Sequence, residues 1–401
     1  MAGSHDDTPT DRIIYFDNAA TSWPKPQPVV DAMCQTLTGE VGNPGRSGHK
    51  MSLNAARIVM SARMEASAVF CVMDPDRIVF TRNVTEALNL AIYGLVKAGD
   101  HVVTSSMEHN SVMRPLRHLE SLGVSLTVAP CEPDGSLNPE DVRAAIRPET
   151  TLVVTTHASN VTGTIVPIEK IASICRSAGV PYLVDAAQTA GVREIDVEQM
   201  GVDLLAFTGH KGLLGPTGTG GLIVADGIDL PPLLRGGTGS RSSEECQPDF
   251  LPDRLESGTA NVVGLAGLAA GIQYLQRTGI DSVARHEQEL VKAFLDGSSR
   301  IPGMRVFGPT EPRENVGTLS FRIDGMSTSE VGQRLEEEAG VMCRIGLHCA
   351  PGAHRTLGTF PDGTVRFGFG LHNTLDEVNT ALDALDRMAR SNTMVGSRRA
   401  L

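Results

Sequence analysis

A lysine flanked by glycines follows an apolar run near the middle of the chain. Residues 203–208 read as a strand, and Gly209-His210-Lys211-Gly212 comes directly after it. Flanking glycines let a lysine reach into a cleft at little steric cost. Burial can remove the proton from its amine, whose ordinary pKa is about 10.4, and the neutral amine can form an imine with a carbonyl group. The alternative is an ordinary lysine in a surface loop.

A carboxylate ends another apolar run. Asp185 follows Tyr182-Leu183-Val184 and precedes Ala186-Ala187-Gln188. A carboxylate at a buried strand end needs a partner. The ring nitrogen of pyridoxal phosphate is such a partner, and it stays protonated beside an aspartate, so that the ring accepts electrons. Taken alone, Asp185 more often caps a helix or holds a loop. An imine-forming lysine in the same chain shifts the interpretation towards pyridoxal phosphate.

The phosphate of such a cofactor needs a cradle of hydrogen-bond donors. Asn83-Val84-Thr85-Glu86 lies between a predicted strand, residues 77–81, and a run with one apolar helical face. At the start of a helix the backbone N–H groups point outward and the helix dipole favours an anion. Thr85 adds a hydroxyl group, and Thr208 and His210 can reach the same phosphate from the lysine loop. The same residues would serve equally well as a plain capping turn.

A cysteine near the C-terminal end lies among glycines and a proline. The segment Arg344-Ile345-Gly346-Leu347-His348-Cys349-Ala350-Pro351-Gly352 indicates an exposed loop rather than a core strand. Arg344 and His348 would favour the thiolate of Cys349, which is the reactive form. The alternatives are an inert cysteine and a metal site that includes His354. The spacing matches no ordinary zinc pattern, and we predict no metal.

An arginine lies among apolar residues after this loop. Val365-Arg366-Phe367-Gly368 reads as a strand, in which a buried arginine requires a partner. The carboxylate of an amino acid suits the planar guanidinium group. The alternative is an internal salt bridge.

The elements that must position these residues form an α/β pattern. Short apolar runs alternate with helical patterns, which is typical of a largely parallel sheet covered on both faces. Ligands of such sheets bind beyond the carboxyl ends of the strands, and several candidate residues fall there. The predicted strands are residues 77–81, 101–105, 124–129, 151–156, 181–185, 203–208 and 220–225.

Beyond about residue 261 the pattern changes. We expect a large cofactor-binding domain, residues 18–262, and a smaller α+β C-terminal domain, residues 263–401, which the N-terminal segment, residues 1–17, joins. The elements expected in this part are helices near residues 262–276, 281–295 and 374–389 and strands near residues 316–323 and 364–369.

Composition and charge exclude several classes of function. The chain of 401 residues has a net charge of -12, which argues against nucleic acid or an anionic membrane as its main partner. No apolar run approaches the ~20 residues that a membrane-spanning helix needs. The seven cysteines are dispersed without a CxxC pair, which suits reduced thiols. We expect a cytoplasmic protein that binds neither nucleic acid nor membrane.

Together, these motifs point to a family. The chain resembles the cysteine desulfurases, within the class V aminotransferase group of fold-type I pyridoxal-phosphate enzymes. The resemblance implies a large domain with a mostly parallel seven-stranded sheet, a smaller α+β C-terminal domain, pyridoxal 5'-phosphate as cofactor and L-cysteine as substrate. The motifs that carry it occur in order along nearly the whole chain: Phe16-Asp17-Asn18-Ala19-Ala20-Thr21, Glu108-His109-Asn110, His157-Ala158-Ser159-Asn160, Asp185-Ala186-Ala187-Gln188, Thr208-Gly209-His210-Lys211, Gly258-Thr259-Ala260-Asn261, Arg344 to Pro351, and Arg366.

The resemblance implies a role for each residue around the cofactor ring. Lys211 would hold the cofactor as an imine and shuttle protons. Asp185 would pair with the ring nitrogen. His109 would stack on the ring and contribute to acid–base steps. Gln188 and Asn160 would form hydrogen bonds with the ring oxygen.

The resemblance also implies how the phosphate is held. Thr85, Thr208 and His210 would bind it. Many relatives have a second hydroxyl group in the phosphate turn, where this chain has Val84, so backbone N–H groups must take a larger share. Thr259 would reach the phosphate of the neighbouring subunit, which implies a homodimer.

For the substrate, the resemblance implies that Cys349 is the nucleophile and carries the sulfur as a persulfide. Arg366 would clamp the substrate carboxylate, with Asn160 or Arg344 assisting. A second thiol or an acceptor protein would then remove the sulfur. The alternatives on the same fold are a selenocysteine lyase, which would act on L-selenocysteine, and a class V aminotransferase or β-eliminating lyase. A sulfur-carrier scaffold without catalysis is the alternative from another class.

Overall fold

The computed structural model describes residues 13–45, 48–241 and 243–399, with side chains described as far as residue 392. Residues 1–12 of the predicted N-terminal segment lie outside the described residues. The expected sheet is present. In order across it, the strands are β2 (Ile78–Thr81), β8 (Gly220–Val224), β7 (Leu204–Thr208), β6 (Tyr182–Asp185), β5 (Thr150–Thr156), β3 (His101–Ser105) and β4 (Ser125–Ala129). β8 runs antiparallel to both of its neighbours, and the other neighbouring strands are parallel. The predicted, mostly parallel seven-stranded sheet is therefore confirmed.

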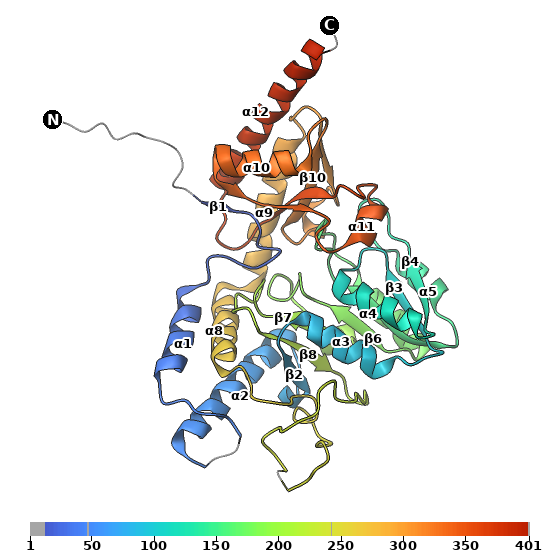
Figure 1. Ribbon diagram of the computed structural model, residues 1–401, viewed down its shortest axis with the longest axis vertical. Helices are drawn as coiled ribbons and strands as arrows, with labels where there is room; N and C mark the ends of the chain where they lie inside the picture. The colour runs from blue at the N-terminus through green and yellow to red at the C-terminus, as the bar shows by residue number, and fades with distance from the viewer. Residues whose placement is uncertain (1–12, 46–47, 242, 400–401) are drawn as a thin grey trace, which may run out of the picture.

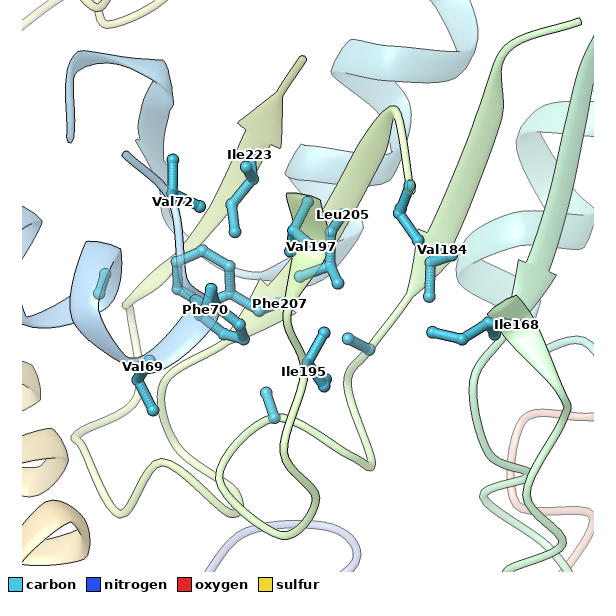
Figure 2. Packing of buried hydrophobic residues seen from close by; sticks show 14 of the residues in the cluster. Val69, Phe70, Val72, Ile168, Val184, Ile195, Val197, Leu205, Phe207 and Ile223 are labelled. Atoms are coloured by element: carbon cyan, nitrogen blue, oxygen red, sulfur yellow. The ribbon is translucent and has the colours of Figure 1, made fainter. Parts of the chain in front are cut away.

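Helices cover both faces of this sheet (Figure 1). They are α2 (Lys50–Phe70), α3 (Val84–Leu95), α4 (Asn110–Ser121), α6 (Ile168–Ala178) and α8 (Val262–Thr278). Adjacent strand residues point to opposite faces, so Leu183 belongs to an apolar cluster with α3 and α4, and Val184 to a second cluster with α2, α6 and α8. Figure 2 shows the second cluster, in which the rings of Phe70 and Phe207 pack with their centroids 5.0 Å apart. Burial on both faces explains why these strands are apolar throughout.

A second, antiparallel sheet lies above the first in Figure 1. Its strands, in order, are β12 (Arg344–Gly346), β13 (Thr364–Gly368), β10 (Thr318–Ile323) and β9 (Met304–Phe307). Phe321 and Phe367 form its core together with Phe16 of the N-terminal segment. That segment also contributes β1 (Ile14–Tyr15), which pairs with β11 (Val341–Met342). The sequence predicted β10 and β13 and missed the short strands around them.

The remaining helices complete the two layers. They are α1 (Gln27–Thr38), α5 (Pro139–Ala145), α7 (Val197–Met200), α9 (Ile280–Ser298), α10 (Thr328–Ala339), α11 (Pro351–Thr356) and α12 (Leu375–Arg399), with 3-10 turns at Pro75–Arg77 and Pro312–Glu314. Within the part of the chain that is described, no helix is both long and apolar enough to cross a membrane.

The packing of α8 helps to locate the boundary between the large and the small domain. Leu268 and Ile272 of α8 belong to the core beneath the first sheet, whereas Leu290 of α9 belongs to the core of the second. The domain boundary predicted at residues 262 and 263 stays a prediction, and this packing favours a boundary nearer Gly279.

Candidate active site

The carboxyl ends of β5, β6 and β7 face the second sheet across a cavity of about 300 Å³. All the residues predicted for the site except Thr259 line this cavity: Val84, Thr85, His109, Asn160, Asp185, Gln188, Thr208, His210, Lys211, Arg344, Cys349 and Arg366. Thr259 lines another, larger cavity of about 930 Å³. Its predicted role concerns a second subunit and stays a prediction.

Lys211 and Asp185 reach the cavity from the ends of neighbouring strands. Lys211 follows β7, and burial lowers the pKa of its amine to about 8, against the opposing charge of Asp185. Asp185 ends β6 and is only 3% exposed. Its Oδ1 accepts a hydrogen bond of 2.9 Å from the N–H of Ala187. Burial raises the pKa of the Asp185 carboxyl, while this hydrogen bond and Lys211 oppose the rise. The cavity therefore holds an amine that loses its proton near neutral pH and a carboxylate that needs a cationic partner.

His109 forms the N-cap of α4. Its Nδ1 accepts the N–H of Ser111 at 3.0 Å, so the neutral ring carries its proton on Nε2. Burial, and then the charge of Lys211, lowers the pKa of this imidazole to about 4. Ser111 was not predicted, yet its Oγ lies 2.9 Å from Nδ1 of His109 and 2.8 Å from Oγ1 of Thr85. The available signal was its place in the first turn of a helix, two residues after a predicted site residue.

The first turn of α3 presents backbone donors to the cavity. Asn83 caps the helix by accepting the N–H of Glu86 at 3.0 Å. The N–H groups of Val84 and Thr85 have no acceptor within the helix, as in any first turn, and both residues line the cavity. His210 lines it too; burial lowers its pKa to about 4, and its buried Nδ1 has no hydrogen-bond partner among the described residues. The backbone N–H groups of Val84 and Thr85, together with the imidazole of His210, are suited to bind an anionic group of a ligand.

Two amide side chains are fixed by main-chain carbonyl groups. Nε2 of Gln188 donates to the carbonyl oxygen of Ala19 at 3.1 Å. Nδ2 of Asn160 donates to the carbonyl oxygen of His348 at 2.7 Å, while its buried Oδ1 has no partner in the described part of the chain. Each amide therefore keeps hydrogen-bonding capacity for a bound ligand.

Arg366 lies on β13 and is 2% exposed. Its Nη2 donates to Oδ1 of Asp17 at 2.7 Å, and its Nη1 donates to the carbonyl oxygen of Asn160 at 2.9 Å. Its buried Nε has no partner among the residues described. The internal salt bridge considered as an alternative is therefore present, and the Nε–H group still lacks an acceptor among these residues. Arg344 lies opposite Arg366 in the β12–β13 register and is exposed.

Cys349 is exposed at the cavity, as predicted for a loop cysteine. Its carbonyl oxygen accepts a hydrogen bond of 2.8 Å from the N–H of Asn110, in the first turn of α4. The expectation that His348 favours the thiolate of Cys349 finds no support in a charge on its ring. The His348 ring is 4% exposed, and burial lowers its pKa to about 2, so the ring is neutral. Arg344 is the cation of this segment that lines the cavity.

Glu108 is a second group that the sequence did not assign. It follows β3, is 1% exposed, and accepts hydrogen bonds from Ser105 Oγ at 2.5 Å and from the N–H of Thr156 at 3.0 Å. Burial raises the pKa of its carboxyl to about 8, and the charge of Asp185 adds to the rise. Burial therefore favours the protonated form of the Glu108 carboxyl, whereas the N–H of Ala187 and the charge of Lys211 favour the ionised form of Asp185.

The residues of the cavity fit pyridoxal phosphate. Lys211 offers an amine for its aldehyde, Asp185 a carboxylate for its ring nitrogen, and the first turn of α3 donors for its phosphate. The unpartnered, buried Oδ1 of Asn160 and Nδ1 of His210 also call for a polar ligand. Among the described residues, no group of three histidine, cysteine or acidic side chains is arranged to hold a metal ion.

Comparison with known proteins agrees with this geometry. A sequence profile of the family described as aminotransferase class-V matches residues 14–380. The chain is 38% identical over 383 residues to a probable cysteine desulfurase of Methanothermobacter thermautotrophicus, and the match covers 94% of each protein. It is 36% identical to a probable cysteine desulfurase of Pyrococcus abyssi, over 95% of this chain and 96% of that relative. It is similar to the solved apo cysteine desulfurase of Thermococcus onnurineus NA1, with a TM-score of 0.88, 35% identity and coverage of 94% of this chain and 95% of that one.

Proposed function

Since this chain belongs to the aminotransferase class-V family, we propose that it is a pyridoxal-phosphate-dependent cysteine desulfurase that converts L-cysteine to L-alanine. The observation that carries the proposal is that Lys211, Asp185 and Cys349 line one cavity although they come from distant parts of the chain.

Bound pyridoxal phosphate supplies an electron sink for a carbanion next to the substrate amino group. Lys211 binds it and moves protons at Nζ, since a pKa of about 8 lets the amine both lose and regain a proton near neutral pH. Asp185 keeps the ring nitrogen protonated, because a buried carboxylate favours a cationic partner. His109, which is neutral and carries its proton on Nε2, would stack on the ring and would supply that proton in acid–base steps. Thr85, Thr208, His210 and the first turn of α3 hold the phosphate.

Arg366 and Cys349 act on the substrate. The guanidinium group of Arg366 binds the carboxylate and orients the amino acid. The Cys349 thiolate attacks the substrate sulfur, so that an S–S bond forms and the C–S bond of the substrate breaks. The electron pair of the C–S bond remains with the substrate carbon. The product carbon takes up a proton as alanine is released, and Cys349 keeps the sulfur as a persulfide. A thiol or an acceptor protein must then remove it.

We also propose a homodimer in the cytoplasm. The cavity of about 930 Å³ that contains Thr259 is also lined by the exposed apolar residues Leu233, Leu234 and Phe250. Exposed apolar side chains gathered in one hollow suit a protein interface, across which Thr259 would reach the second site. All seven cysteines are free thiols, which supports a reducing compartment.

The proposal is tested by measuring alanine and sulfide formed from cysteine by the parent protein and by Cys349→Ala. The parent should form alanine, and Cys349→Ala should bind the cofactor, with absorbance near ~420 nm, but release no sulfur from cysteine. Parent-like turnover of cysteine by Cys349→Ala would remove the nucleophile assignment. Parallel rates on selenocysteine distinguish a selenocysteine lyase, because selenium can leave without an enzyme thiol.

A further inference from the structure

The side chain of His348, next to Cys349, turns into the protein and meets a chain of hydroxyl groups. Its Nε2 lies 3.2 Å from the carbonyl oxygen of Thr364 and 3.1 Å from Oγ1 of the same residue. Thr364 Oγ1 donates to Ser320 Oγ at 2.9 Å, and Ser320 Oγ donates to the carbonyl oxygen of Val161 at 2.7 Å. The hydroxyl relay, Thr364 and Ser320, therefore links the cysteine loop through β13 and β10 to the chain that follows β5.

This relay fixes the tautomer of His348. The carbonyl oxygen of Thr364 can only accept, and the Thr364 hydroxyl proton is already donated to Ser320. Nε2 of His348 must therefore carry the ring proton, which leaves Nδ1 as an acceptor. Nδ1 is buried and has no partner in the described part of the chain. The ring is anchored on one side, and its other nitrogen lies unpaired in a segment that lines the active-site cavity.

The backbone on either side of this ring is held in an unfavourable conformation. His348 has a φ of 47° and Cys349 a φ of 58°, in the left-handed region that side chains rarely adopt. Two hydrogen bonds hold the turn from outside: Nδ2 of Asn160 donates to the carbonyl oxygen of His348, and the N–H of Asn110 donates to that of Cys349. Consecutive left-handed residues persist only where several contacts determine them together.

We infer that His348 is a positioning residue for Cys349: its ring, anchored by the hydroxyl relay, holds the His348–Cys349 turn so that the thiol stays at the cavity. This inference rests on the proposed role of Cys349 as the nucleophile. The hydrogen bonds from Nε2–H of His348 to Thr364 fix the ring, and the fixed ring stabilises the left-handed turn.

The inference is tested with His348→Ala, Thr364→Val and the matched control Thr364→Ser. Thr364→Val keeps the shape of the side chain and removes the hydroxyl that connects His348 to Ser320, whereas Thr364→Ser keeps that hydroxyl. Single-turnover persulfide formation on Cys349, followed by mass spectrometry, should slow by about tenfold or more in His348→Ala, because small misplacements of a reacting group cost this much or more. It should slow by a smaller factor in Thr364→Val, which keeps the carbonyl oxygen of residue 364 as an acceptor for Nε2. The KM for cysteine should stay at the parent value, and Thr364→Ser should retain the parent rate.

Hydrogen exchange of the cofactor-free protein gives a readout that is independent of catalysis. Amides of residues 347–353 should exchange faster in His348→Ala and Thr364→Val, while Thr364→Ser should match the parent. His348→Gly separates the ring from the backbone, because glycine adopts a positive φ freely. Parent-like persulfide formation and exchange in His348→Gly or Thr364→Val would overturn the inference. A parent protein that forms no persulfide on Cys349 would instead remove the proposed function.

Discussion

The side chains of Asp17 and Arg366 form a buried ion pair, with 2.7 Å between Oδ1 and Nη2. The side chain of Arg366 is 2% exposed and that of Asp17 is 23% exposed. The carbonyl oxygen of Asn160 accepts from Nη1, so that two of the guanidinium nitrogens are already engaged before any substrate binds. A substrate carboxylate therefore meets an arginine whose orientation is fixed by the protein.

Arg366→Lys should raise the KM for cysteine by about 10- to 100-fold, because a charge-assisted hydrogen bond is lost and a lysine cannot satisfy Asp17, Asn160 and the substrate together. The change in kcat should be smaller. Initial rates at varied cysteine concentration measure both values. Arg344→Lys, on the exposed neighbouring strand, is the comparison, and its KM should change less. An unchanged KM in Arg366→Lys would mean that the carboxylate binds elsewhere.

The capture of pyridoxal phosphate by the cofactor-free protein should depend on pH through Lys211. Burial lowers the pKa of this amine to about 8, and only the neutral amine attacks a carbonyl group. The rate should rise about tenfold per pH unit below pH 8 and level off above it. Stopped-flow absorbance at saturating cofactor measures the profile. A rate that continued to rise well above pH 8, towards the ordinary pKa of a lysine, would contradict a buried amine.

Ser111→Ala should weaken cofactor binding by up to about tenfold, which is the effect expected for one hydrogen-bonding group. Ser111 Oγ lies 2.8 Å from Thr85 Oγ1 and lines the cavity, so it offers a further hydroxyl beside a turn in which residue 84 is valine. Equilibrium titration with pyridoxal phosphate gives the dissociation constant. Ser111→Thr keeps the hydroxyl group and should bind more tightly than Ser111→Ala; equal affinity of parent and Ser111→Ala would exclude a contribution from this hydroxyl.

Glu287 should make the protein less stable as pH rises. Its side chain is 5% exposed, and its Oε2 has no partner among the described residues. Burial raises its pKa from 4.5 to about 8, so the folded protein binds more protons than the unfolded chain between these values, and the stability it contributes is lost as pH rises through this window. Glu287→Gln removes the titrating carboxyl group. Between pH 5 and pH 8, the free energy of unfolding of the parent should therefore fall by on the order of 1–4 kcal/mol more than that of Glu287→Gln.

Thermal unfolding of the cofactor-free protein at pH 5 and pH 8 measures this difference. Glu289→Gln serves as the control, because it makes the same substitution at an exposed position on the same helix, α9. If the parent and Glu287→Gln lose or gain the same stability between the two pH values, Glu287 is ionised in the folded protein.

Much of the fold could be predicted because its signals are local. Each strand of the large sheet is an apolar run buried on both faces, and the polar residues at their ends, such as Asp185 and Lys211, mark the ligand edge. β9 and β12 were missed because they are short and partly exposed, which leaves no apolar run to recognise.

The environment of the site residues was harder to predict, since it depends on contacts distant in sequence. His348 was expected to favour the thiolate from its position beside Cys349, but the packing of the loop against Thr364 buries the ring and keeps it neutral. The partner of Arg366 could not be chosen between a ligand and an internal acid, because Asp17 lies at the other end of the chain.

Reduction of the cofactor-bound protein with borohydride, followed by peptide mapping by mass spectrometry, tests the central assignment most directly. Lys25 is the informative rival, because its half-buried amine also has a pKa lowered to about 8 and donates to the carbonyl oxygen of His210 at 2.9 Å. We expect the reduced cofactor on Lys211 alone, in both the parent and Lys25→Met. A label on Lys25, or an unlabelled Lys211, would contradict the account.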